Sequence, residues 1–349
     1  MHRRAFLGFT TAALLASRVP LRAAAIPGTP PAPGEPTVMT VRGPVAAAQL
    51  GLVLPHEHVL VDFIGAADVS PARYDAGVAF AKIKPFLDEA HDLGCRTFFE
   101  CTPAFLGRDP RLLVRLSEAT GLRLVTNTGY YAARQNKFLP AHALTESADE
   151  LAARWQREWT AGIDGTGVRP GFIKIGLDAG PLTPAGRKLA QAAARTHRAT
   201  GLAIAAHTGD HVAALAQLAV LRDEGVHPSA WIWVHAQNAK DAAALTTAAR
   251  AGAWLSFDGV APPTLARHVA SVVDLKRQGF LDQLLVSHDA GWYRPGEPDG
   301  GAFRGYDALF RAFLPAVRRE GFADAEIARL TVENPARAFA TRVRVAGGG

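Results

Sequence analysis

Short apolar runs alternate with longer amphipathic stretches from about residue 50 to the end of the chain. Continuously apolar runs are typical of parallel strands that are covered on both faces, and the stretches between them carry the spacing of helices. The alternation predicts an α/β fold with eight parallel strands. These are expected at residues 52–57, 96–101, 122–127, 170–175, 202–207, 231–236, 254–258 and 283–288.

Residues that favour helix starts lie between these runs. Asp109-Pro110, Thr183-Pro184 and Asn334-Pro335 each place a capping residue before a proline, which suits the first helical position. Eight strands that alternate with helices predict a (β/α)8 barrel, and barrels of this length fold as one domain.

Three segments with different compositions precede the first predicted barrel strand. Residues 37–51 (TVMTVRGPVAAAQLG) predict an N-terminal β-hairpin that turns at Gly43-Pro44 and underlies the first barrel strand. Residues 26–36 form a linker rich in proline and glycine. The barrel domain is therefore expected to span residues 37–345.

Residues 1–25 have the features of an export signal. Arg3-Arg4 precede Phe6-Leu7, a modest apolar stretch follows, and Ala23-Ala24-Ala25 come last. A twin arginine followed by Phe-Leu resembles the signal of proteins exported after folding, and an ordinary secretory signal is the alternative. Because the apolar run is too short to span a bilayer, we expect a soluble mature protein that is periplasmic or secreted.

Composition narrows the range of partners. The chain is 48% hydrophobic and 20% charged, which is ordinary for a soluble enzyme with a large core. The net charge of +6 falls to +2 without the four arginines of residues 1–25, and no basic stripe with interleaved aromatics remains, which argues against nucleic acid. Cys95 and Cys101 flank one strand too far apart for a disulfide, so both are expected to be buried thiols.

Potential metal ligands end five of the eight predicted strands. Lys174, His207 and His235 follow one another at intervals of about 30 residues, the length of one strand-plus-helix repeat. In a barrel the carboxyl ends of the strands form one rim, so residues far apart in sequence converge there. Neutral imidazole and carboxylate are usual ligands of catalytic divalent metals. The predicted ligands are His56, His58, Lys174, His207, His235 and Asp289.

Strand geometry and amine chemistry refine this site. The two-residue period places His56 and His58 on one side of a strand and Glu57 on the other; a hydrogen-bonded core pair is the alternative. Burial and a nearby dication would lower the pKa of Lys174, and the neutral amine could then add carbon dioxide to give a carbamate that bridges two metals. The alternative for Lys174 is an ion pair with a carboxylate at the barrel mouth.

Seven motifs together resemble the phosphotriesterase-like family of the amidohydrolase superfamily, over roughly Thr37 to Phe339. They are GxxLPHEHVLVDF (51–63), TPAFLGRDP (102–110), TGYY (128–131), GFIKIG (171–176), AAHTG (205–209), VHAQN (234–238) and LLVSHDAGW (284–292). The resemblance implies a metal-dependent hydrolase with a binuclear centre.

The resemblance also implies a role for each position. His56, His58 and Asp289 would hold the buried metal, His207 and His235 the more exposed one, and carboxylated Lys174 would bridge them. Asp289 would also accept the proton of the bridging water, and the metal-bound hydroxide would attack an ester or lactone. Tyr131 matches the tyrosine of lactonase-type members. Zinc suits the ligands best, and cobalt, manganese or iron would also fit.

Three departures leave the substrate open. Gly259 follows Asp258 where the family carries histidine or arginine, Asn238 replaces an acidic residue, and the loop at 296–305 is short and rich in glycine. The alternatives to an ester or lactone hydrolase are an organophosphate triesterase and a metal-bearing binding protein without efficient turnover. A homodimer is the default expectation.

Several other side chains carry weaker expectations. Glu100 is expected either to orient a ligand histidine or to make a structural hydrogen bond, and strand alternation should turn His288 away from the metals. Trp292 and Phe105 would wall a substrate pocket or simply pack. The remaining histidines on helices and loops are expected at the surface, and these are His197, His227 and His268.

Overall fold

The computed structural model of the protein describes residues 31–32 and 34–347. The export signal predicted at residues 1–25 lies outside the described residues, as does most of the linker predicted at 26–36, and both stay predictions. Within the described part of the chain, no helix is long and apolar enough to cross a membrane.

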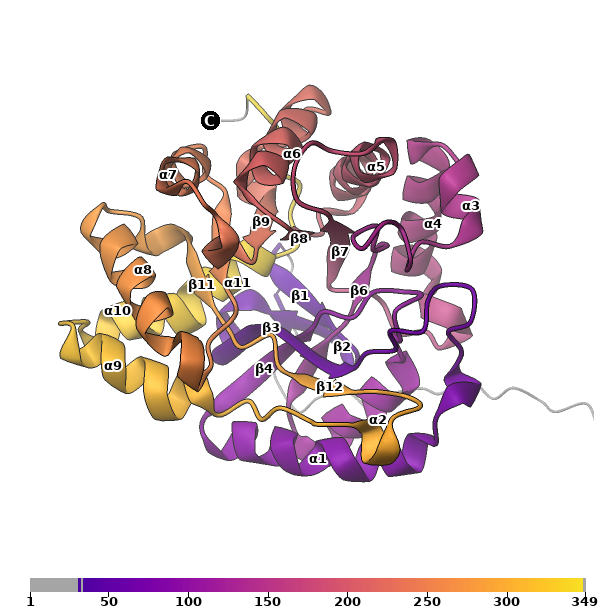
Figure 1. The fold of residues 1–349 in the computed structure, drawn as a ribbon, viewed down its shortest axis with the longest axis horizontal. Coiled ribbons are helices and arrows are strands. Elements are labelled where there is room, and N and C mark those ends of the chain that lie inside the picture. The colour runs from indigo at the N-terminus through magenta and orange to yellow at the C-terminus, as the bar shows by residue number, and fades with distance from the viewer. Residues whose placement is uncertain (1–30, 33, 348–349) are drawn as a thin grey trace, which may run out of the picture.

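Parallel strands form a closed ring at the centre of the molecule (Figure 1). Each strand pairs with the next in chain order, and the ring closes where the last segment pairs with the first. The third and eighth strands are each interrupted, which gives ten segments for eight barrel positions. In order they are β3 (Leu52–Leu60), β4 (Cys95–Glu100), β5 (Arg123–Val125) with β6 (Asn127–Thr128), β7 (Phe172–Leu177), β8 (Ile204–Thr208), β9 (Trp231–Val234), β10 (Trp254–Phe257), and β11 (Leu284–Val286) with β12 (Gly291–Tyr293). The predicted (β/α)8 barrel is confirmed.

Helices surround the ring in chain order (Figure 1). They are α1 (Ala76–Asp92), α2 (Pro110–Thr120), α3 (Ala141–Thr145), α4 (Ala148–Ala161), α5 (Pro184–Thr200), α6 (His211–Asp223), α7 (Ala242–Arg250), α8 (Leu265–Arg277), α9 (Leu314–Arg319), α10 (Asp324–Ala328) and α11 (Asn334–Phe339). Asp109 and Thr183 cap α2 and α5 as predicted, since each side chain accepts a hydrogen bond from a free backbone N–H of the first turn. The cap predicted at Asn334 is wrong: its amide donates to the carbonyls of Leu281 and Leu284 and ties α11 to β11.

The N-terminal hairpin is present, but its turn lies two residues earlier than predicted. Strands β1 (Thr37–Thr40) and β2 (Gly43–Ala46) pair with Thr40 opposite Gly43, so Val41 and Arg42 form the turn. The hydroxyl of Thr40 accepts from the Arg42 N–H and donates to the Gly43 carbonyl, which closes the turn at this point. The Val41 N–H donates to the Leu124 carbonyl and attaches the hairpin to β5.

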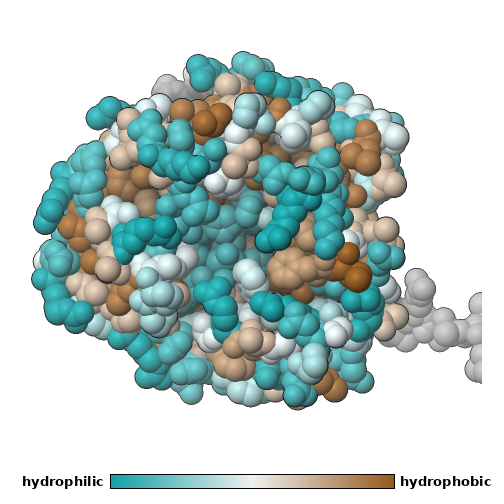
Figure 2. Space-filling view, in the orientation of Figure 1, coloured by the Kyte–Doolittle hydropathy of each residue, from teal (hydrophilic) through white to brown (hydrophobic). Residues whose placement is uncertain are grey.

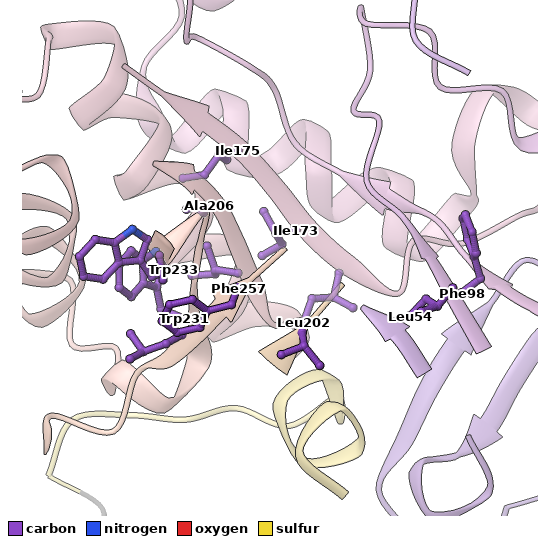
Figure 3. Close-up of a cluster of buried hydrophobic side chains, with 14 of the residues drawn as sticks. Leu54, Phe98, Ile173, Ile175, Leu202, Ala206, Trp231, Trp233 and Phe257 are labelled. Atoms are coloured by element: carbon purple, nitrogen blue, oxygen red, sulfur yellow. The ribbon is translucent and has the colours of Figure 1, made fainter. Parts of the chain in front are cut away.

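Side-chain alternation divides the core into two layers. Ile173 and Ile175 of β7 point outward into the layer between strands and helices, where Trp231 and Trp233 also lie (Figure 3). Phe172 belongs instead to the layer inside the barrel, which the hairpin and α11 help to close. Lys174 shares the inward direction of Phe172. The two-residue period of β7 therefore places an amine inside the barrel above a hydrophobic floor.

Candidate metal centre

Three predicted ligands from the first and eighth strands meet inside the barrel. His58 Nε2 lies 3.1 Å and His56 Nε2 3.5 Å from the same carboxylate oxygen, Oδ1 of Asp289. One ligand atom from each residue lies within 4.8 Å of the other two. Both imidazoles are buried, at 1% and 8% exposure. The face of the molecule shown in Figure 2 is hollowed and hydrophilic at its middle.

Hydrogen bonds to Nδ1 fix which nitrogen of His58 faces the centre. Its Nδ1 lies 2.7 Å from Oγ1 of Thr102, whose hydroxyl donates to the Leu60 carbonyl. Because that hydroxyl proton is already used, Nδ1 is the donor, and Nε2 is the ring nitrogen that faces the Asp289 carboxylate at 3.1 Å. Nitrogen and carboxylate atoms that converge in this way are ligands that a divalent ion takes.

Asp289 is placed by a hydrogen-bonded seam between the eighth and first strands. The buried carboxylate of Glu57 accepts from the N–H groups of His288 and Ala290, which flank Asp289, and from the Ser287 hydroxyl. Asp289 itself is left-handed at φ 52°, and its N–H donates to the His56 carbonyl. The seam therefore turns the Asp289 carboxylate towards the two histidines.

The side chains of Glu57 and His288 point away from the ligands, as predicted. His288 Nδ1 donates to Glu57 at 2.6 Å, and its Nε2 accepts from the Leu309 N–H at 2.8 Å. These contacts satisfy both ring nitrogens, so His288 has no lone pair left for a metal.

His207 and His235 form the second predicted ligand group. Their ring centroids are 4.5 Å apart, and the His235 ring lies 5.2 Å from that of His56. His235 is left-handed at φ 64°, and Asp258 accepts from both its N–H and its Nδ1. The Nδ1 bond leaves Nε2 as the metal-binding lone pair. The carboxylate that orients His235 was not singled out in the sequence, although Asp258 ends the seventh apolar run.

Glu100 does not contact the predicted ligand His58 directly, because Thr102 lies between them. Its carboxylate lies 3.9 Å from His58 Nδ1, too far for a hydrogen bond, and accepts instead from the Thr102 N–H. Thr102 is the direct partner of His58. Burial raises the pKa of Glu100 to about 7.

Lys174 is 2% exposed and has no carboxylate within 4.0 Å in the described part of the chain, so the alternative of an ion pair at the barrel mouth does not hold. Burial lowers the pKa of Lys174, and its charge acts on His56 and His207, one from each ligand group. A neutral amine near both groups of ligands suits the carbamate that is predicted to bridge two metals.

Burial and charge keep His56, His207 and Asp289 in metal-binding forms, whereas at His235 the Asp258 carboxylate outweighs burial and raises the pKa. Burial lowers the pKa of His56 and holds that of His207 well below the ordinary value, so both stay neutral. Burial opposes the ionisation of Asp258 and Asp289, but neighbouring histidine charges and hydrogen bonds outweigh it and lower both carboxyl pKa values. Neutral imidazoles with ionised carboxylates are the donor set that divalent metals take.

Aromatic side chains wall one side of the centre. The Tyr131 ring lies 5.0 Å from the His207 ring and 5.6 Å from Lys174 Nζ, and burial raises its pKa, so the phenol stays protonated. Gly176 permits this position, since a Cβ there would lie 2.2 Å from the ring. Trp292 packs edge-on against His58 at 6.1 Å. Phe105 lines a separate cavity of about 470 Å³ beside Tyr130, which contains none of the six predicted ligands.

The surface positions predicted for His197 and His268 are wrong, because both are fully buried. His197 Nδ1 donates to the Leu202 carbonyl, and its Nε2 accepts from the Arg344 N–H. His268 fills the space that Gly259 leaves free, with Nε2 3.1 Å from where a Cβ on Gly259 would lie. The Arg344 N–H and the space beside Gly259 are tertiary features that the sequence around each histidine does not reveal.

The fold and the site define a metal-dependent hydrolase of the barrel type. The model of the phosphotriesterase family matches residues 36–339, and the chain belongs to this family. Enzymes of the family are binuclear metal hydrolases, and the His56–His58–Asp289 cluster agrees with this.

Individual relatives carry different activities. The phosphotriesterase homology protein of Escherichia coli is 31% identical over 83% of this chain and 98% of its own length. An aryldialkylphosphatase of Saccharolobus solfataricus is 27% identical over 84% of this chain and 96% of its own. A solved variant of a phosphotriesterase-like lactonase of Deinococcus radiodurans is 32% identical with a TM-score of 0.79, and covers 87% of this chain and all of its own.

Proposed function

We propose that the protein hydrolyses carboxylic esters or lactones with two divalent ions, of which zinc suits the ligands best. His56, His58 and Asp289 would hold one ion, His207 and His235 the other, and carboxylated Lys174 would bridge them. The observation that carries this proposal is the convergence of Nε2 of His56 and Nε2 of His58 on one carboxylate oxygen of Asp289, at 3.5 and 3.1 Å, inside the barrel. The likeness to a lactonase supports the substrate class.

Two bound divalent ions would polarise the substrate carbonyl and lower the pKa of the attacking water. The chain supplies the remaining chemistry. Asp289, held by the Glu57 seam, would accept the water proton at its carboxylate. The protonated phenol of Tyr131 would donate a hydrogen bond to the carbonyl and orient it. Trp292 and Phe63, whose rings pack at 5.7 Å, would exclude water from one side.

An organophosphate triesterase is the second candidate, and the likeness to an aryldialkylphosphatase favours it. A binding protein without efficient turnover is the third.

Export by the twin-arginine route is proposed from residues 3–7 alone. Cell fractionation of the wild type and of an Arg3→Lys, Arg4→Lys variant would test it.

Metal analysis followed by a panel of esters, lactones and phosphotriesters tests the function. We expect about two divalent ions per chain and the highest kcat/KM on an ester or lactone. His56→Ala should lose metal and activity together, whereas His91→Ala, on the outer helix α1, should keep both. A folded protein that binds no divalent metal would contradict the proposal, and turnover of phosphotriesters alone would favour the second candidate.

A further inference from the structure

Two arginines flank the tryptophan at the entrance to the metal centre. The loop after β12 returns to this strand, where Gly291 and Arg304 exchange two backbone hydrogen bonds of 2.9 and 3.0 Å. The guanidinium of Arg304 then lies 5.9 Å from the Trp292 ring centroid, and that of Arg294 lies 5.7 Å from it. Trp292 itself packs edge-on against the predicted ligand His58.

Arg304 is fixed in place without being neutralised. Its Nη1 donates to the Asp289 carbonyl at 3.0 Å and its Nη2 to the His288 carbonyl at 3.5 Å, and both acceptors are uncharged. Among the described residues no carboxylate lies within 4.0 Å of it, whereas Arg294 pairs with Glu297 at 3.3 Å. Arg304 is also exposed. Its positive charge and remaining N–H donors therefore face solvent beside a metal ligand.

We propose that Arg304 selects substrates that carry an anionic group, a carboxylate or a sulfonate, away from the bond that is cleaved. The inference rests on the proposed hydrolase function and defines its substrate class. A guanidinium binds such oxygens through charge-assisted hydrogen bonds, and its planar fork matches a carboxylate. The Trp292 ring would pack against the apolar part of the substrate between the two ends.

Stacking on Trp292 supports a recognition role. Hydrogen bonds to two consecutive carbonyls and contact with an aromatic face restrict the guanidinium before a substrate arrives, so less side-chain entropy is lost on binding. A neutral phosphotriester would gain nothing from this charge. Arg304 would thus favour anionic esters or lactones over neutral substrates of the same shape.

The test compares 4-acetoxybenzoate with its methyl ester, which differ in the distal charge, by following acetate release from the metal-loaded protein. The wild type should prefer the anion. Arg304→Gln should lower kcat/KM for 4-acetoxybenzoate roughly tenfold or more, mainly through KM, and change the methyl ester less than about twofold. Arg304→Lys should keep part of the preference. Arg311→Gln removes an exposed arginine paired with Glu89 and should change neither substrate.

Equal losses on both substrates in Arg304→Gln would overturn the inference, because they would show that Arg304 only supports the Asp289 segment. A binding measurement decides even if the wild type cleaves no ester, a result that would contradict the proposed function by itself. In calorimetric titrations, 4-hydroxybenzoate should bind the wild type more tightly than 4-hydroxybenzyl alcohol, and Arg304→Gln should weaken only the benzoate. Equal binding of both compounds by the wild type would also overturn the inference.

Discussion

At the scale of single residues, hydrogen bonds within the chain orient two of the predicted ligands. Thr102 accepts from Nδ1 of His58 and Asp258 from Nδ1 of His235, so each ring offers Nε2 to the centre. Such outer partners fix both the tautomer and the ring orientation of a metal-binding histidine.

Tyr131 is the residue that should separate lactones from phosphotriesters. Loss of a pocket contact is typically worth about 1–3 kcal/mol, so Tyr131→Phe should lower kcat/KM for a lactone or ester by roughly ten- to a hundredfold. Metal content should not change, and the effect on a phosphotriester should be much smaller. Equal losses on both substrate classes would assign Tyr131 to the fold or the metals instead.

Lys174 should be needed for its carbamate and not only for its bulk. Lys174→Ala should lose most activity, and short-chain carboxylates such as acetate or propionate should restore part of it by replacing the bridging oxygens. Lys82→Ala on α1 is the matched control and should behave as the wild type with or without added carboxylate. Normal metal content and rate in Lys174→Ala would exclude the bridging role.

At the scale of elements, the barrel closes through a side chain and not through backbone pairing alone. Residues 287–290 interrupt the eighth strand between β11 and β12, and in this gap Glu57 replaces the missing ladder. A carboxylate offers two acceptor oxygens with about four lone-pair sites, whereas an amide offers one oxygen with two. The interruption also frees Asp289 to adopt its left-handed conformation.

Glu57→Gln should therefore weaken both the seam and the metal site. One amide oxygen replaces two acceptors, and the new NH₂ group would face the buried N–H groups on one side. An unsatisfied buried donor costs about 1–3 kcal/mol, so we expect a loss of roughly 2 kcal/mol in urea unfolding together with weaker metal affinity. Glu320→Gln, at the exposed end of α9, should change stability by less than about 0.5 kcal/mol. Unchanged metal affinity in Glu57→Gln would show that the seam does not position Asp289.

At the scale of the whole molecule, the C-terminal segment ties together elements from both halves of the chain. The Thr341 N–H donates to the Thr37 carbonyl of the hairpin, and the Arg342 N–H donates to the Gly201 carbonyl after α5. His197 adds the buried bond to the Arg344 N–H. Because that bond uses a lone pair on Nε2, it requires a neutral imidazole.

Stability should consequently depend on pH through His197. Burial lowers its pKa below the ordinary 6.5, so the folded chain binds this proton less readily than the unfolded chain. His197 makes its full contribution to the free energy of unfolding above about pH 6.5. This contribution is lost as the pH falls towards the lowered pKa of the folded chain, with a slope of at most about 1.4 kcal/mol per pH unit. His197→Gln should be less stable than the wild type at pH 8 but lose less stability between pH 7 and 5. Parallel pH profiles from urea unfolding would contradict this.

The sequence by itself determined features that depend on short-range periodicity. Continuous apolar runs located the barrel strands, and the two-residue alternation placed Glu57 opposite His56 and His58. The caps at Asp109 and Thr183 followed from residue types next to prolines. These predictions succeed because their causes, strand pleat and unpaired N–H groups at helix starts, lie within a few residues of one another.

Only the tertiary structure decided how the distant groups meet. Glu57 reaches Asp289 through the N–H groups on either side of it, Thr102 stands between Glu100 and His58, and Asn334 bonds to β11 instead of capping α11. His197 accepts from the distant Arg344 N–H, and His268 fills the space beside Gly259. Each of these side chains chooses among several hydrogen-bond partners, and the partner that it finds depends on which segments the closed barrel brings within about 3 Å of it.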